Sequence, residues 1–152
     1  MTDYQNGRFT VTARSPGGPP DPCWIVLDYA NDPAAHQAAR HYANSSVNRS
    51  PAVCEELTVA LDGGQVGATL RTHDVTDVLD PPGARYLVLD CAHSYPARVA
   101  LLTYAAAAAS TSPANAAAVT AALAGTAEQF RAWCEHLNAR TASSGGRRKR
   151  RP

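Results

Sequence analysis

Two aspartates occupy matching places in the sequence and are the first candidates for chemistry. Asp28 ends the run WIVLD, and Asp90 ends the run YLVLD. Two carboxylates that a fold brings together can act as general acid and general base. Aspartate after an apolar run also accepts backbone N–H bonds in the turn that follows. We favour the turn role, so neither aspartate is predicted to be catalytic.

A cysteine–histidine arrangement follows the second run. Cys91 and His93 are two residues apart, and residues at that spacing on a strand face the same side. A thiol beside an imidazole is the arrangement of a nucleophile with its base. The matching positions after the first run hold Tyr29 and Asn31, so the arrangement is not repeated. We therefore predict a protein without catalytic residues.

The cysteines also indicate the cellular compartment. They lie far apart, with no C-x-x-C and no spacing typical of a metal site. We predict that they are reduced and mostly buried in a cytoplasmic protein with no metal and no cofactor. The four are Cys23, Cys54, Cys91 and Cys134.

A basic cluster ends the chain and is the main candidate for binding. Residues 1–146 contain 9 basic and 13 acidic residues, a net charge of −4. Clustered arginine and lysine bind phosphates without sequence preference, because they release counterions from the nucleic acid. The alternative is a solubilising tail with no partner. The candidate nucleic-acid-binding residues of the cluster are Arg147, Arg148, Lys149, Arg150 and Arg151.

Two aromatic residues extend this candidate set. Trp24 and Tyr86 begin the two apolar runs. On a strand, Trp24 shares a face with Val26 and Asp28, while the opposite face is aliphatic. We expect helices to cover the aliphatic face and the aromatic face to remain open. Aromatic side chains on an open sheet stack nucleobases, or they pack against a protein partner or a second subunit.

The elements that must position these residues occur twice. Residues 19–63 align with residues 81–125 without a gap, and 17 of the 45 positions are identical. We interpret this as an internal duplication. Ser50-Pro51 and Ser112-Pro113 each combine an N-cap with a proline at the first helical position. Each copy is therefore predicted to end in a helix, and the second helix either continues past Gly125 or breaks there.

The remaining segments are read as strands. Residues 84–91 and 7–15 have strand patterns bounded by turn signals. Residues 98–104 (RVALLTY) are predicted to be a strand, and residues 36–44 are left open between strand and helix. The predicted class is α+β: two tandem pseudo-twofold repeats, each of three to four antiparallel strands followed by a helix. The repeats span residues 1–63 and 64–141 of one compact domain, and residues 142–152 are predicted to be a disordered basic tail.

The second copy resembles the actinobacterial domain of unknown function 317. The resemblance rests on YLVLDCA, HSYPA, RVALLTY and SPANAAAVTAALA, which the first half repeats as CWIVLDYA, NDPAA, HQAARHY and RSPAVCEELTVAL. It implies no activity, because that family has none established. At fold level, tandem strand–helix repeats are similar to the Whirly and purine-rich-element-binding folds, which implies single-stranded nucleic acid on an open sheet.

These features predict a non-catalytic, nucleic-acid-associated protein with DNA or RNA as its partner. Its basic tail would act as an electrostatic tether and its open sheet as a stacking surface. The alternative is a protein–protein interaction or homodimerisation module that uses the same sheet face. We expect no membrane partner, because no apolar run approaches the ~18 residues that a membrane span needs.

Overall fold

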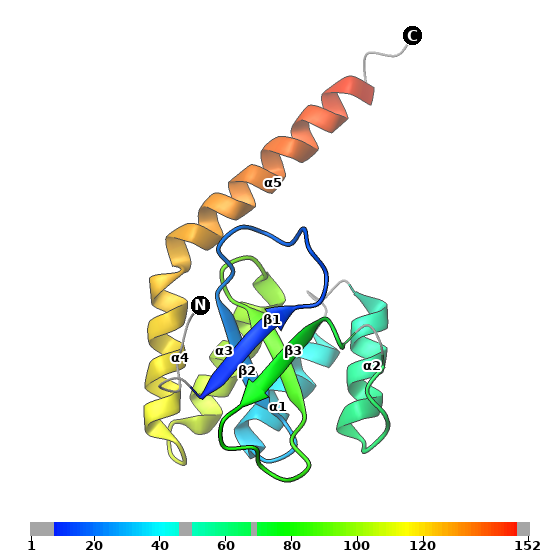
Figure 1. Cartoon of the computed structure of the whole chain (residues 1–152). Coiled ribbons are helices and arrows are strands. Elements are labelled where there is room, and N and C mark those ends of the chain that lie inside the picture. The colour runs from blue at the N-terminus through cyan, green and yellow to red at the C-terminus, as the bar shows by residue number, and fades with distance from the viewer. Residues whose placement is uncertain (1–7, 46–49, 68–69, 149–152) are drawn as a thin grey trace.

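The computed structural model describes residues 8–45, 50–67 and 70–148. The described part is α+β, with two short sheets and a set of helices (Figure 1). The elements in chain order are β1 (Phe9–Ala13), β2 (Trp24–Asp28), α1 (Pro33–Asn44), α2 (Pro51–Leu61), β3 (His73–Asp77), β4 (Tyr86–Asp90), α3 (Tyr95–Ala108), α4 (Pro113–Gly125) and α5 (Ala127–Arg148).

Each sheet pairs one strand from the first half of the chain with one from the second half. β1 pairs antiparallel with β3, and Val11 lies opposite Val75. β2 pairs antiparallel with β4, and Val26 lies opposite Val88. In the β2–β4 ladder, Trp24 is opposite Asp90 at one end, and Asp28 is opposite Tyr86 at the other.

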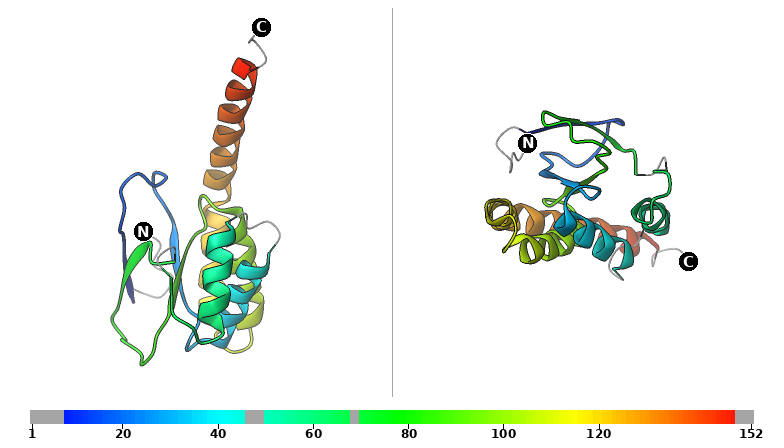
Figure 2. Two further views of the ribbon diagram at one scale, coloured as in Figure 1. Left: turned by 90° about the vertical axis from the view of Figure 1, so that its right-hand side faces the viewer. Right: turned by 90° about the horizontal axis from the view of Figure 1, so that it is seen from below.

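The elements form three layers. The β1–β3 sheet lies in front of the β2–β4 sheet, and the helices pack behind the latter (Figures 1 and 2). In the view from below, helices α2, α1, α3 and α4 stand side by side in that order (Figure 2). The layer that contains β2 and β4 is therefore covered on both faces.

The main core lies between the β2–β4 sheet and the helices. The aliphatic face of the sheet enters this core through Ile25, Leu27, Leu87 and Leu89, as the alternation predicts. The helices meet it with many alanines, and short side chains allow helices to pack closely on one another. Tyr104 of α3 is the largest of the fully buried side chains.

The prediction of a strand over residues 98–104 is wrong. These residues lie in α3, and residues 36–44, which the sequence left open, lie in α1. Ser94 caps α3 by accepting the N–H of Ala97 at 3.2 Å, and Asp32 caps α1 by accepting the N–H of Ala34 at 3.0 Å. In the described residues, each half therefore has two strands and at least two helices, instead of three or four strands and one helix.

Alanine spacing explains this difference. The buried face of α3 is helical in period, with residues spaced three or four apart. It consists of Ala97, Ala100, Leu101, Tyr104 and Ala108. Alanines supply more than half of this stripe, and in the sequence alone they do not stand out as a buried face. The β-branched and aromatic residues of the segment, which are typical of a strand, are therefore the stronger signal.

The predicted helices that begin at a proline are confirmed. Pro51 and Pro113 occupy the first turns of α2 and α4, after Ser50 and Ser112. Gly63 follows α2 with φ of +91°, a conformation that suits glycine, and its N–H bonds to the carbonyl of Ala60. Of the two alternatives predicted at Gly125, the helix breaks there: α4 ends at Gly125 and α5 begins at Ala127.

The predicted open sheet face is also wrong, because the β1–β3 sheet covers it. Val26 on that face is only 2% exposed. The Trp24 ring meets the His73 ring edge-to-face at 5.1 Å, and the Tyr86 ring meets the Phe9 ring at 5.9 Å. β1 alternates apolar and polar residues, and such a strand must bury its apolar side. It does so against β2–β4, so Trp24 and Tyr86 lie half-buried between the sheets.

α5 extends well beyond the other elements (Figures 1 and 2). Its first turns pack on the start of α3: the Phe130 ring stacks on Tyr95 at 6.4 Å, and the Trp133 ring meets His93 at 4.9 Å. From Glu135 to Ser143 every side chain is exposed. The helix continues to Arg148, so residues 142–148 are helical where composition predicts disorder. Residues 149–152 of the predicted tail lie outside the described residues.

All four cysteines are free thiols, and two of them face each other across the β2–β4 pair. The N–H of Cys91 bonds to the carbonyl of Cys23 at 3.0 Å. Cys23 and Cys91 are buried, whereas Cys54 and Cys134 are half-buried. A hydrogen bond between the two thiols, together with burial, raises the pKa of Cys91 well above its usual range.

This difference predicts the reactivity of the thiols. Only the thiolate reacts with Ellman's reagent, so Cys91 is expected to be inert in the folded protein at pH 8. Native protein should release fewer than four equivalents of thionitrobenzoate, with Cys54 and Cys134 reacting first, and urea should expose the remainder. The variant Cys134→Ser is the control, because it should remove a fast-reacting thiol. Rapid reaction of Cys91 in folded protein would contradict this assignment.

Candidate functional site

A pocket of about 540 Å³ opens at the end of the sheets where Trp24 begins β2. Its walls come from three segments that are distant in sequence: the loop after β1, the approach to β3, and the end of β4. Long-range pairing of β1 with β3 and of β2 with β4 brings these segments together. Its chemically distinctive side chains are Arg14, Trp24, Arg71, His73 and Asp90. We call it the Trp24 pocket.

The aromatic wall of the pocket is held in place by its neighbours. Trp24 lies opposite Asp90 in the ladder, and its ring meets His73 at an interplanar angle of 72°. Nδ1 of His73 shares a hydrogen bond of 2.8 Å with the hydroxyl of Thr72. Burial lowers the pKa of His73, although the nearby Asp90 carboxylate opposes this effect. The imidazole is therefore neutral at pH 7.

Asp90 has a structural role at the base of the pocket. Its Oδ1 accepts the backbone N–H of Cys23 at 3.2 Å and that of Ala92 at 3.0 Å. Its Oδ2 lies 2.8 Å from Nδ1 of His93. These contacts tie the end of β4 to the start of β2 and satisfy both carboxylate oxygens.

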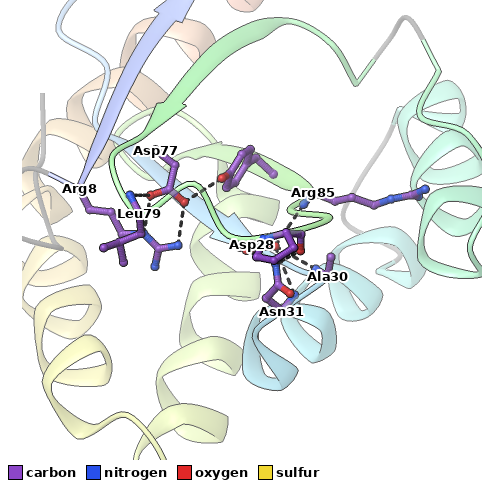
Figure 3. A network of polar contacts seen from close by, with 9 residues as sticks. Arg8, Asp28, Ala30, Asn31, Asp77, Leu79 and Arg85 are labelled. Atoms are coloured by element: carbon purple, nitrogen blue, oxygen red, sulfur yellow. Dashed lines mark hydrogen bonds and ion pairs between the residues drawn. The ribbon is translucent and has the colours of Figure 1, made fainter.

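Asp28 has the same role at the other end of the ladder (Figure 3). Its Oδ1 accepts backbone N–H groups from Ala30, Asn31 and Arg85 at 3.2–3.3 Å. Its Oδ2 accepts Nδ2 of Asn31 at 2.9 Å. Four residues of strand, about 13 Å, separate the ladder positions of Asp28 and Asp90. The two carboxylates therefore do not share a site.

Tyr86 lies away from the Trp24 pocket, beside Asp28. Its hydroxyl donates to Oδ2 of Asp77 at 2.7 Å. Burial and this hydrogen bond to a carboxylate raise the pKa of Tyr86 above its usual range. The structure thus separates the two aromatic residues that the sequence analysis grouped as one stacking surface.

Asp77 joins the two sheets at the Tyr86 end. Nε and an NH2 group of Arg8 bond to its two oxygens at 2.8 and 2.7 Å (Figure 3). The N–H of Leu79 adds a further contact to the carboxylate at 3.0 Å. Hydrogen bonds from Arg8 lower the pKa of Asp77 from 3.8 to about 2, against the opposing effect of burial.

Because the folded carboxyl of Asp77 has the lower pKa, its contribution to stability is complete above the unfolded pKa of 3.8 and is lost as the pH falls through about 2. We expect the free energy of unfolding to fall by about 2 kcal/mol more in wild type than in Asp77→Asn between pH 5 and pH 2. Urea unfolding at half-unit pH steps would measure this difference. Equal losses in both proteins would contradict the assigned role of Asp77.

The described part of the basic cluster lies at the end of α5, far from both ends of the β2–β4 ladder (Figure 1). Arg147 and Arg148 are the last described residues of α5, at its free end (Figure 1). Lys149, Arg150 and Arg151 lie outside the described residues. The structure therefore places Arg147 and Arg148 apart from Trp24 and Tyr86.

Arg71 lines the Trp24 pocket and lies outside the predicted set of nucleic-acid-binding residues. The other described arginines of residues 8–126 have acceptors in the fold. Arg8, Arg14 and Arg40 bond to carboxylates. Arg85 and Arg98 bond to backbone carbonyls, most of which lie at helix ends. Within the described residues, the exposed Arg71 has no such partner. No local motif marks it, because its place beside Trp24 depends on strand pairing.

Metal clusters and membrane-spanning helices are not found in the described residues. Across residues 8–45, 50–67 and 70–148, no three histidine, cysteine or acidic side chains gather into a possible metal site. No helix in this same part of the chain has the length and apolar character that a bilayer crossing requires.

The comparisons with known proteins identify no relative. No protein-family model matches the chain, and no curated protein or solved structure matches it.

Proposed function

We propose that this is a non-catalytic, nucleic-acid-associated protein that contacts phosphate backbones through the free end of α5. We call residues 135–152 the arm. The observation that carries the proposal is a separation of charge: the arm has a net charge of +5, and residues 1–134 have a net charge of −4. The helix carries the first part of this charge away from the acidic body (Figure 2).

The shape of the arm supports this role. Its side chains from Glu135 to Ser143 are exposed, so the helix is free to lie along a nucleic acid. An acidic body repels phosphates elsewhere on the surface and directs them to the arm. Serine and glycine at residues 143–146 are weak helix formers, so contacts to phosphates would also stabilise this last part of α5.

The test is binding of labelled single- and double-stranded DNA by fluorescence anisotropy. We expect wild-type affinity to fall roughly 10²–10³-fold between 50 and 200 mM salt, because about five phosphates are neutralised. A variant with glutamine at all five positions from Arg147 to Arg151 should lose this binding. The matched control, Arg40→Gln, removes one positive charge from the body, where it pairs with Asp62. Equal binding by the five-glutamine variant and wild type would refute the role of the arm.

The sheet face predicted for a protein partner or homodimer offers no second candidate. The β1–β3 sheet packs on that face and leaves Val26 2% exposed. A partner at this face would have to displace a whole sheet. The four free thiols support our proposal of a cytoplasmic location.

We also propose that the two halves are tandem copies related by a pseudo-twofold axis. Matching elements start 62 residues apart: 24 and 86, 33 and 95, 51 and 113. The hydrogen bonds of Asp28 and Asp90 match at the same spacing, since Arg85 donates to Asp28 as Cys23 donates to Asp90. The axis would pass between Val26 and Val88, which lie opposite each other.

A further inference from the structure

We propose that the Trp24 pocket binds one nucleoside monophosphate unit, either a free nucleotide or a unit of a single strand. The pocket is on the body, and the arm is a separate element. The inference therefore does not rest on the function proposed for the arm. It rests on an aromatic wall, an arginine that pairs with no carboxylate of the described residues, and a cavity of matching size.

The aromatic wall suits a planar ring. Trp24 is half-buried, so part of its indole lines the cavity. The contact with His73 and the pairing of β2 with β4 fix its orientation before any ligand arrives. Pro16, Pro19 and Pro22 add apolar surface from the loop after β1. Stacking on a fixed aromatic ring accepts any nucleobase, because every base has a π-face.

The charge of the pocket suits a phosphate. Arg71 lines the cavity with no carboxylate partner in the described part of the chain. Arg14 lines it too, and its Nε bonds to Asp74 at 2.8 Å. A guanidinium binds phosphate oxygens through several N–H groups held in one plane. The Arg71 cation beside an aromatic wall therefore favours a ligand that combines a planar ring with an anionic group.

The other two polar side chains do not oppose this anion strongly. His73 is neutral at pH 7, since burial lowers its pKa. The Asp90 carboxylate is already bound by two backbone N–H groups and by His93. Arg14 is paired with Asp74, so the positive charge offered to a ligand comes from Arg71, which has no carboxylate partner in the described residues.

The volume also fits. Small-molecule pockets range from about 300 to 1,000 Å³, and this one is about 540 Å³. A nucleotide has both features that the walls recognise, a planar ring for Trp24 and a phosphate for Arg71. Inorganic phosphate offers only the second feature, and a nucleoside only the first.

The experiment uses Trp24 as its own reporter. The chain has two tryptophans, so Trp133→Phe leaves Trp24 as the single indole. We expect AMP to quench its fluorescence with a dissociation constant in the range of about 0.1–1 mM. Arg71→Gln in this background should weaken AMP binding about tenfold and leave adenosine binding unchanged. Arg40→Gln, outside the pocket, is the matched control and should change neither.

A second titration distinguishes the two sources of the ligand. A six-residue oligo(dT) is titrated into the five-glutamine variant, which lacks the basic cluster. Binding of AMP identifies a free nucleotide as an occupant, and binding of the oligonucleotide alone identifies a strand unit; either supports the proposal if Arg71→Gln weakens it. Calorimetry with Trp24→Leu should show the same loss. The proposal is wrong if neither probe binds at concentrations up to about 10 mM, or if Arg71→Gln leaves both affinities unchanged.

Discussion

Replacement of Asp28 by alanine is expected to lower the free energy of unfolding by about 3 kcal/mol. The Asp28 side chain accepts three backbone N–H groups and the amide of Asn31, and the residue is 6% exposed. Alanine leaves these partly buried donors without their acceptor. The effect is large because one donor is the N–H of Arg85, which directly precedes β4. Its hydrogen bond to Asp28 therefore links β4 to the end of β2.

Urea unfolding followed by far-UV circular dichroism measures this loss. Asp74→Ala is the matched control, because it removes an aspartate from an exposed ion pair with Arg14. Exposed ion pairs contribute about 0–1 kcal/mol, so this variant should unfold close to wild type. A similar midpoint for both variants would show that Asp28 does not hold the two strands together.

Replacement of Tyr104 by alanine is expected to cost about 3–5 kcal/mol. Tyr104 has no exposed surface and is the largest of the fully buried side chains. Its hydroxyl donates to Oδ2 of Asp32 at 3.0 Å, and Asp32 also caps α1. Alanine would create a cavity between α3 and its neighbours and would remove this link between two helices.

The variant Tyr104→Phe separates the two contributions. It keeps the ring and removes only the hydroxyl, so a loss of about 1 kcal/mol is expected. Thermal unfolding of both variants at the same pH provides the comparison. If Tyr104→Phe were as unstable as Tyr104→Ala, the hydrogen bond to Asp32 would outweigh packing, contrary to this prediction.

Local chemistry made part of this fold predictable. Ser-Pro pairs located the starts of α2 and α4, and strand alternation assigned Ile25 and Leu27 to the helix-covered face. Both signals lie within a few residues of the feature that they predict. The role of Asp28 as an acceptor of backbone N–H groups in the following turn could be recognised in the same way, since the donors Ala30 and Asn31 are close to it in the sequence.

The errors concern features that depend on distant residues. The α3 segment has the sequence pattern of a strand because Val99, Thr103 and Tyr104 favour strands, while the alanines between them become informative only when other helices pack on them. The cover over Trp24 depends on the pairing of β1 with β3, which lies far along the chain. Arg71 acquires its place in the Trp24 pocket through the same pairing, and no short motif records it.

The strand pairing has a consequence for fragments of this protein. Both ladders join the first half of the chain to the second, so in the described residues neither half contains a strand pair of its own. A chain cut within residues 62–72 gives two pieces that can complete their sheets only with each other. The two pieces should therefore complement when co-expressed, and two intact chains that exchange halves would form a domain-swapped dimer with the same ladders.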